Sequence, residues 1–249
     1  MSANSDRKPE LSITQRMKET VIKAIIFDKD GTLFNFNATW GAWAKGLLMA
    51  EAGDDLQRLN ALAGALGYDL ETAQFLPGSV VIAEPAAVIA DAMLPYLPET
   101  NQAQILARVN AAASVAPQVE AVPLRPFFAD LQTRGLKLGV ATNDAQEPTH
   151  AHLGRAEIID VFDFIAGSDS GFGGKPAPGQ LLAFCEQTGL APTECIMVGD
   201  SRHDLIAGRA AGMHTVGVLT RPARAVELAP LADVVLQTIG EIPAWLDHQ

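Results

Sequence analysis

Two patterns of hydrophobic and polar positions follow one another along the chain. Residues 23–27 form a short β-rich run that ends at Asp28, which predicts a strand buried on both faces, as in a parallel sheet. From about residue 39 to residue 113, segments of helical length are rich in alanine and leucine and are interrupted by glycine and proline. Because almost no strand signal occurs there, we expect a helical bundle inserted after the first strand.

Helices and strands are predicted to alternate after Pro123. The predicted helices cover residues 126–135, 145–154, 177–189 and 202–212, and the predicted strands cover residues 136–142, 163–167, 194–200 and 214–219. A glycine stands where each helix is expected to end, namely Gly135, Gly154, Gly189 and Gly212. This order predicts an α/β fold with a Rossmann-like, doubly wound parallel sheet and helices on both faces.

These patterns divide the chain into three expected parts. They are a polar N-terminal tail of residues 1–20, an α/β core of residues 21–36 and 122–249, and an inserted all-helical cap domain of residues 37–121. Folds of this class bind ligands beyond the carboxyl ends of the strands. We therefore expect the site at that edge of the sheet.

Composition and charge exclude some classes of function. The chain has 249 residues and a net charge of −11, which repels a phosphate backbone, so nucleic acid is not an expected partner. No basic amphipathic segment or long apolar run suggests a membrane. Cys185 and Cys195 form no CxxC pair, and the first 20 residues contain no apolar core like that of a signal peptide. We therefore expect a cytoplasmic protein, either a monomer or a homodimer.

Four predicted strands end in residues that carry chemistry. They are Asp28 and Asp30 in DKDGT, Thr142 and Asn143 in ATN, Lys175 in GSDSGFGGKPAP, and Asp200 and Asp204 in GDSRHD. If the strand ends converge, Asp28, Asp30 and Asp200 share a small space and resist ionisation together. A hard divalent cation such as Mg²⁺ removes this conflict. The set therefore favours phosphate chemistry over hydride or acyl chemistry.

Some of these positions also have a structural interpretation. The Asp-Gly pair of DKDGT, between apolar runs, fits a two-residue hairpin turn. Asp144 with Glu147, and Ser201 with Asp204, each fit a capping box at the start of a helix. Lys175 is different, because a cation in the expected first turn of a helix opposes the helix dipole. A bound anion explains Lys175 better than stability does.

The four motifs, in this order, resemble the signature of the haloacid dehalogenase superfamily. DKDGT, ATN, GGKP and GDSRHD stand within residues 25–219, and the helical insertion resembles the cap of the phosphoglycolate phosphatase-like branch. The resemblance implies a Mg²⁺-dependent phosphatase that hydrolyses a small phosphorylated metabolite through an aspartyl-phosphate. The presence of Asp30 favours a phosphate ester, because an alcohol leaving group needs a proton.

The resemblance also implies a role for each site residue. Asp28 is the expected nucleophile, and Asp30 protonates the leaving alcohol and later takes a proton from water. Thr142 and the backbone N–H of Asn143 hold phosphoryl oxygens, and Lys175 neutralises charge beside them. The expected magnesium ligands are Asp28, Asp200 and the backbone carbonyl of Asp30, with Asp204 orienting them. The cap is expected to close over the site and to choose the substrate.

Two positions depart from the family's usual pattern. Lys29 stands where an apolar or aromatic residue is common, and Asn35 stands where aspartate is frequent. One hypothesis is that Lys29 faces the cap and meets a second anionic group of the substrate, such as a carboxylate. The alternative is a solvated lysine that pairs with a surface acid.

Several alternatives stay open at this stage. A β-phosphoglucomutase-like phosphomutase shares the motifs and the cap, and a non-catalytic binding protein could share the fold. His150 and His152 make a poor zinc pair because they are two residues apart on a predicted helix. We expect Trp40 and Trp43 to pack in the core of the cap, with stacking on the substrate as the alternative. His203 lies beside the GDSRHD motif and could touch the substrate, but we expect it to be an exposed helix residue.

Overall fold

The parallel sheet predicted for the core is present and is continuous. The computed structural model describes residues 21–76, 78–82, 84–220 and 225–248. In this part of the chain one sheet has six strands in the order β5-β4-β1-β6-β7-β8, and all neighbouring strands are parallel. The strands are β1 (Ala24–Phe27), β4 (Lys137–Ala141), β5 (Phe164–Ala166), β6 (Cys195–Gly199), β7 (His214–Val218) and β8 (Val234–Leu236).

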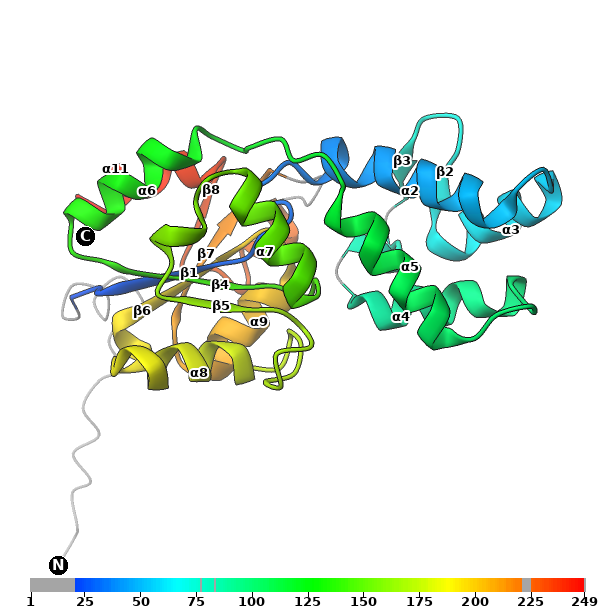
Figure 1. Cartoon of the computed structure of the whole chain (residues 1–249). Helices are drawn as coiled ribbons and strands as arrows, with labels where there is room; N and C mark the ends of the chain where they lie inside the picture. Colours follow the sequence, from blue (N-terminus) through cyan, green and yellow to red (C-terminus); the bar gives the residue numbers. More distant parts are fainter. Residues whose placement is uncertain (1–20, 77, 83, 221–224, 249) are drawn as a thin grey trace, which may run out of the picture.

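Helices cover both faces of this sheet (Figure 1). They are α6 (Leu124–Thr133), α7 (Gln146–Arg155), α8 (Gly179–Thr188), α9 (Arg202–Ala211), α10 (Ala225–Leu228) and α11 (Ile242–Leu246). One apolar cluster joins Phe27 of β1 to Phe128 of α6, and the other joins Ile26 of β1 to Phe184 of α8. Consecutive residues of β1 thus enter opposite clusters, which explains why this strand is apolar throughout.

The inserted segment has a hydrophobic cluster of its own. Its helices are α2 (Phe36–Ala52), α3 (Leu56–Leu66), α4 (Ala86–Met93) and α5 (Gln102–Ser114), with short 3₁₀ turns η1 (Val80–Ile82) and η2 (Leu94–Tyr96). Leu48, Leu62 and Met93 are completely buried in this cluster, which is separate from the two clusters of the sheet. Figure 1 shows these helices beside the sheet, beyond the ends of its strands.

The expectation of an all-helical insertion was wrong at one place. Strands β2 (Tyr68–Asp69) and β3 (Gln74–Phe75) form a short antiparallel ladder between α3 and α4. The rings of Tyr68 and Phe75 lie 5.2 Å apart at an edge-on angle, which stabilises this pairing. Two-residue strands are too short to produce an alternating pattern in the sequence.

Two chain segments connect the inserted helices to the sheet, and they pair with each other. The Asn35 N–H donates to the Val119 carbonyl at 2.7 Å, and the Ala121 N–H donates to the Leu33 carbonyl at 2.9 Å. Asn35 also accepts a hydrogen bond from the Ala38 N–H at 3.1 Å and caps α2. The residue that departs from the family's pattern therefore starts the first inserted helix.

In the core, the structure confirms strand β1 and the predicted order of helices and strands from α6 to β7. Gly189 and Gly212 end their helices in the left-handed conformation, whereas Gly154 lies inside α7, so its predicted role as a stop signal was wrong. Strand β8 and helices α10 and α11 were not predicted, because three to five residues carry too little periodicity. The predicted N-terminal tail lies outside the described residues, and none of the helices described is both long and apolar enough to cross a membrane.

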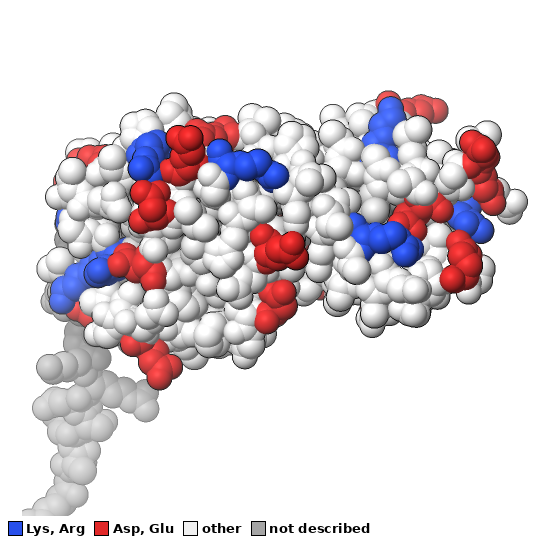
Figure 2. All heavy atoms as spheres, viewed as in Figure 1, with Lys and Arg blue, Asp and Glu red and all other residues white. Residues whose placement is uncertain are grey.

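Charged side chains are mixed by sign on the face of the molecule drawn in Figure 2. Arg108 pairs with Glu51 on the inserted helices, and Arg125 pairs with Asp160 on the core, both at 2.6 Å. The Arg125–Asp160 pair is exposed and screened by water, so it contributes little to stability. The pairs of charges that matter for function lie in the interior.

Candidate active site

The end of β1 reaches the end of β6 through a turn that needs glycine. The Asp28 N–H donates to the Val198 carbonyl of β6 at 2.8 Å. Gly31 follows with a φ of +85°, and a Cβ at this position would overlap the Asp200 carboxylate. Only glycine combines this backbone conformation with such a close approach. The Asp-Gly pair thus makes a tight turn after β1 and does not join two strands of a hairpin, so that alternative was wrong.

Three buried carboxylates and one buried lysine form the centre of the site. Oxygens of Asp28, Asp200 and Asp204 all lie within 4.8 Å of one another. The Lys175 Nζ lies 2.6 Å from an oxygen of Asp28 and 2.6 Å from an oxygen of Asp204. These four side chains are at most 6% exposed. The structure therefore brings together residues that are up to 176 positions apart, as expected from the convergence of strand ends.

The charges of this cluster do not balance. Burial raises the pKa of the Asp28 carboxyl to about 8, and the neighbouring Asp204, Asp200 and Asp30 carboxylates add to the rise against the opposing effect of Lys175. Burial lowers the pKa of Lys175, but the Asp204 and Asp28 carboxylates outweigh it and raise the pKa above its usual value. Three acidic oxygens around one ammonium are a donor set that suits a hard divalent cation.

Residues that follow β4 hold the loop that carries Lys175 in place. The Asn143 side chain donates from Nδ2 to the Lys175 carbonyl at 2.9 Å and accepts from the Lys175 N–H at 2.8 Å. Gln180 is completely buried and donates to the carbonyls of Thr142 and Gly167 at 3.0 and 2.9 Å. From the sequence, the backbone N–H of Asn143 was predicted to bind phosphate. The two hydrogen bonds of its side chain with the Lys175 backbone, here called the Asn143 clamp, had no signal in the sequence.

Asp204 serves helix α9 and the cluster at the same time. One of its oxygens accepts from the Ser201 N–H at 2.9 Å and from the Ser201 hydroxyl at 2.7 Å, which closes a capping box. Its other oxygen pairs with Lys175. The structural interpretation of the Ser201–Asp204 pair is therefore confirmed, and it positions the carboxylate that the cluster uses.

One part of the argument for Lys175 was wrong. Helix α8 begins at Gly179, so Lys175 lies before the helix and not in its first turn. The helix dipole therefore does not account for this lysine. Its burial against Asp28 and Asp204 gives the stronger reason, because a buried ammonium needs carboxylates or another anion as partners.

A second buried lysine lies beside the cluster. The Lys29 Nζ lies 2.5 Å from the Asp30 carboxylate, 3.3 Å from that of Asp144 and 3.0 Å from His152 Nδ1. It also lies 5.4 Å from the centre of the Trp40 ring of α2. Lys29 is completely buried, so the alternative of a solvated surface lysine was wrong. Asp144 pairs with this lysine and does not cap α7, whose N-cap residue is Ala145.

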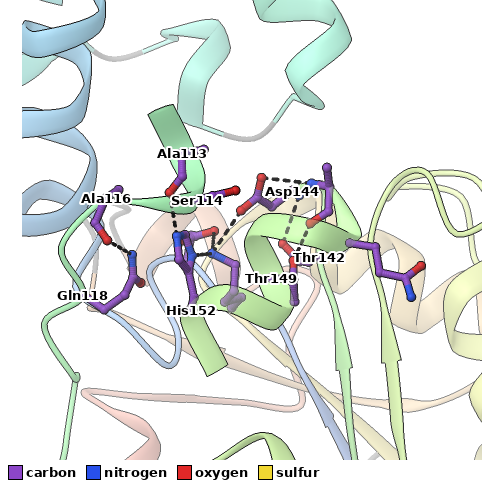
Figure 3. Close-up of polar contacts among 12 residues, drawn as sticks. Ala113, Ser114, Ala116, Gln118, Thr142, Asp144, Thr149 and His152 are labelled. Carbon is purple, nitrogen blue, oxygen red and sulfur yellow. Dashed lines mark hydrogen bonds and ion pairs between the residues drawn. The ribbon is translucent and has the colours of Figure 1, made fainter. Parts of the chain in front are cut away.

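His152 connects this lysine to the inserted helices. Its Nε2 lies 2.7 Å from the carbonyl of Ala113 in α5, as Figure 3 shows. The Ala113 carbonyl can only accept, so Nε2 carries the proton and Nδ1 accepts from Lys29. Burial lowers the pKa of His152 to about 4, and the charge of Lys29 acts in the same direction. His152 is therefore a neutral bridge between the sheet and α5.

The carboxylates keep Lys29 charged. Burial lowers its pKa, but the Asp30 and Asp144 carboxylates outweigh burial and raise the pKa above its usual value. Burial raises the pKa of Asp144 to about 6, against the effect of Lys29. The Lys29 ammonium is thus already paired with two carboxylates within the protein.

A cleft that is partly open to solvent lies between the sheet and the inserted helices. On the core side, its lining includes the predicted residues Asp28, Asp30, Thr142, Asn143, Lys175 and Asp204. Trp40 and Trp43 pack edge to face at 5.1 Å, as expected for a core, and they also line the cleft, as does the half-buried His203. The expectation that His203 is exposed was therefore wrong.

Comparisons with known proteins point to one family. The model of the haloacid dehalogenase-like hydrolases matches residues 22–212. A phosphoglycolate phosphatase of Nitrosospira multiformis is 30% identical over 195 residues, which cover 78% of this chain and 81% of that protein. A phosphoglycolate phosphatase of Escherichia coli K12 is 35% identical over 125 residues, 48% of this chain and 49% of that protein, so the match spans about half of that relative.

Solved structures show the same fold at low sequence identity. A predicted phosphoglycolate phosphatase of Haemophilus somnus has a TM-score of 0.69 and 18% identity, covering 90% of this chain and 97% of that chain. CbbY of Rhodobacter sphaeroides, in complex with phosphate, has a TM-score of 0.65 and 22% identity, covering 91% of this chain and 100% of that chain.

Proposed function

This chain belongs to the haloacid dehalogenase-like hydrolase family, and we propose that it is a Mg²⁺-dependent phosphatase acting on a small phosphorylated metabolite. One observation carries the proposal. The Asp28 carboxylate contacts the Lys175 ammonium at 2.6 Å beside Asp200 and Asp204, and Asp28 and Lys175 both line the cleft. A nucleophile, a cation and acidic oxygens in one cleft are what phosphoryl transfer requires.

Asp28 is the proposed nucleophile. Its carboxylate attacks the phosphorus of the ester, forms an aspartyl-phosphate and expels the alcohol, and water then hydrolyses this intermediate to inorganic phosphate and free Asp28. The Lys175 ammonium, held by Asp204 and by the Asn143 clamp, lies against the attacking oxygen and attracts the charge of the phosphoryl group. Thr142 and the Asn143 N–H are proposed to bind phosphoryl oxygens.

Asp30 is the proposed acid and base. It lines the cleft, one oxygen pairs with Lys29, and Oδ1 is buried without a hydrogen-bond partner among the described residues. This free oxygen can deliver a proton to the leaving alcohol and then take one from the attacking water. Lys29 anchors the other oxygen and so fixes the direction of the carboxyl group.

Mg²⁺ is the proposed cofactor. Asp28 and Asp200 would hold it, together with the backbone carbonyl of Asp30, and Asp204 would orient the set. The unbalanced charge of the Asp28, Asp200 and Asp204 cluster supports this choice. When bound, the ion acts as a Lewis acid that neutralises the charge of the transferring phosphoryl group. We also propose that residues 37–121 act as a cap over this site, and that the protein acts in the cytoplasm.

The test is phosphate release from a panel of phosphate monoesters, with and without Mg²⁺. We expect release only with the ion, and a loss of at least about a thousandfold in kcat for Asp28→Asn. The matched control is Asp160→Asn, an exposed aspartate paired with Arg125 on the surface, which should keep wild-type activity. Asp28→Asn activity within tenfold of the wild type would contradict the proposed nucleophile.

A further inference from the structure

The inserted helices present an apolar wall to the proposed phosphate site. The residues that they contribute to the cleft include Phe36, Trp40, Trp43, Ile89 and Val109. All five are at most 6% exposed and belong to the cluster of the inserted helices. A leaving group that enters the cleft beyond the phosphate therefore meets aromatic rings and aliphatic side chains, which favour a carbon skeleton.

Positive charge is missing from this wall. Lys175 is the one lysine or arginine among the described residues that line the cleft, and it already contacts Asp28 and Asp204. Lys29 is completely buried, does not line the cleft, and is neutralised by Asp30 and Asp144. The hypothesis that Lys29 binds a carboxylate of the substrate is therefore not supported, because the lysine is already paired and has no access to the cleft.

Negative charge is present instead. Glu84 lines the cleft from the inserted segment, and Asp30 and Asp144 line it from the core. An anionic group on the leaving alcohol would meet carboxylates and apolar side chains, and the described residues of this lining offer it the His203 imidazole but no lysine or arginine that is not already paired. Burying a charge in such surroundings is costly, and placing like charges together costs several kcal/mol.

Two polar atoms at the wall have no partner. Trp43 Nε1 and Asn110 Oδ1 are buried, and neither makes a hydrogen bond within the described part of the chain. Both residues line the cleft. The first atom can only donate and the second can only accept. A hydroxyl group can satisfy either of them, since it both donates and accepts, and this would remove the cost of an unpaired buried atom.

We propose that the substrate is the phosphate monoester of an alcohol that carries no further negative charge and has an apolar carbon part and a further hydroxyl group. The proposal rests on the phosphatase function given above and specifies its leaving group. It separates this chain from an enzyme whose preferred substrate is phosphoglycolate, the ester named for the relatives of similar sequence, because that ester carries a carboxylate next to the phosphate.

A series of four esters of similar size tests the charge of the leaving group. They are 2-hydroxyethyl phosphate, phosphoglycolate, 2-aminoethyl phosphate and propyl phosphate, in which the first carbon bears CH2OH, COO−, CH2NH3+ or CH2CH3. We expect kcat/KM to be highest for 2-hydroxyethyl phosphate and about a hundredfold lower for phosphoglycolate.

Each outcome of the series decides the proposal. A preference of tenfold or more for 2-hydroxyethyl phosphate over phosphoglycolate supports it, and any smaller preference overturns it. If phosphate is released from none of the four esters in the presence of Mg²⁺, the proposed phosphatase function is overturned as well. The two failures are distinguishable, because activity on phosphoglycolate would leave the phosphatase function intact.

Variants at Asn110 test the wall itself. Asn110 is half-buried and lines the cleft, so a longer side chain has room to reach the substrate. Asn110→Lys should raise kcat/KM for phosphoglycolate relative to 2-hydroxyethyl phosphate about tenfold, because it supplies the missing cation. Asn110→Met, of similar length and without charge, is the control and should not raise this ratio. If the ratio of kcat/KM for phosphoglycolate to that for 2-hydroxyethyl phosphate were equal in Asn110→Lys and Asn110→Met, the leaving group would not lie against α5.

Discussion

Asp30 is proposed to act in two proton transfers, so a substitution at this single residue should affect both steps of the reaction. Asp30→Asn removes the acid for the leaving alcohol and the base for the attacking water. We expect kcat for alkyl phosphates to fall by about 10²–10⁴. With p-nitrophenyl phosphate, whose leaving group needs no proton, we expect a burst of about one equivalent of nitrophenolate and then slow turnover. Rapid-mixing absorbance measures the burst.

The control for this experiment is Asp28→Asn, which should give no burst because it lacks the nucleophile. Steady turnover of p-nitrophenyl phosphate by Asp30→Asn at the wild-type rate would show that another group activates the water. A missing burst with Asp30→Asn would contradict a covalent intermediate on Asp28.

His152 makes stability depend on pH in a defined direction. Its folded pKa of about 4 lies below the ordinary histidine pKa of 6.5, so the unfolded chain binds a proton at a higher pH than the folded chain does. The free energy of unfolding therefore falls as the pH drops from about 6.5 to 4. Between pH 7.5 and pH 5, His152→Gln should remove roughly 2 kcal/mol of this dependence.

Urea unfolding of the wild type and of His152→Gln at the two pH values measures the difference. The titrations of Asp28 and Asp144 are common to both proteins and largely cancel in the comparison. Equal dependence on pH in the two proteins would mean that His152 is not held in its neutral form by burial and by Lys29.

At the scale of elements, the end of β6 packs closely against the first turn of α9. A Cβ at Gly199 would overlap the Asp204 side chain, which closes the capping box of α9 and pairs with Lys175. Gly199→Ala should displace the first turn of α9 and lower kcat/KM at least about tenfold, since small misplacements of a reacting group are costly. Phosphate-release kinetics and thermal unfolding measure the effect.

Gly154→Ala is the matched control for this substitution. Gly154 lies in α7, and a Cβ there would meet nothing within 4 Å. Since alanine is favoured over glycine inside a helix, the variant should be as active as the wild type and about 0.5–1 kcal/mol more stable. If Gly199→Ala behaved like Gly154→Ala, the close packing of β6 against α9 would not be needed for catalysis.

At the scale of the whole molecule, the inserted helices have a core that is separate from those of the sheet. We predict that they unfold as a unit of their own. Leu62→Ala, which removes a completely buried side chain from α3, should destabilise that unit by about 2–5 kcal/mol. Hydrogen exchange should then speed up in residues 36–114 and stay unchanged in β1, β4 and β6.

The opposite substitution, Leu138→Ala in β4, removes a completely buried side chain from a cluster of the sheet. It should speed up exchange in the sheet. If Leu62→Ala accelerated exchange throughout both parts, they would form one cooperative unit, and the proposed division into core and cap would be incorrect.

Local periodicity and motifs were enough to predict the family, strand β1 and the order of helices and strands from α6 to β7. It also located Asp28, Lys175 and Asp200 at strand ends, and parallel strands bring such ends to one edge. The structure was needed to show that Lys29 pairs with Asp30 and Asp144 and contacts His152, and that apolar side chains face the phosphate site. Asp144 and His152 lie more than a hundred positions from Lys29, so the burial and pairing of this lysine depend on contacts that a local sequence pattern does not contain.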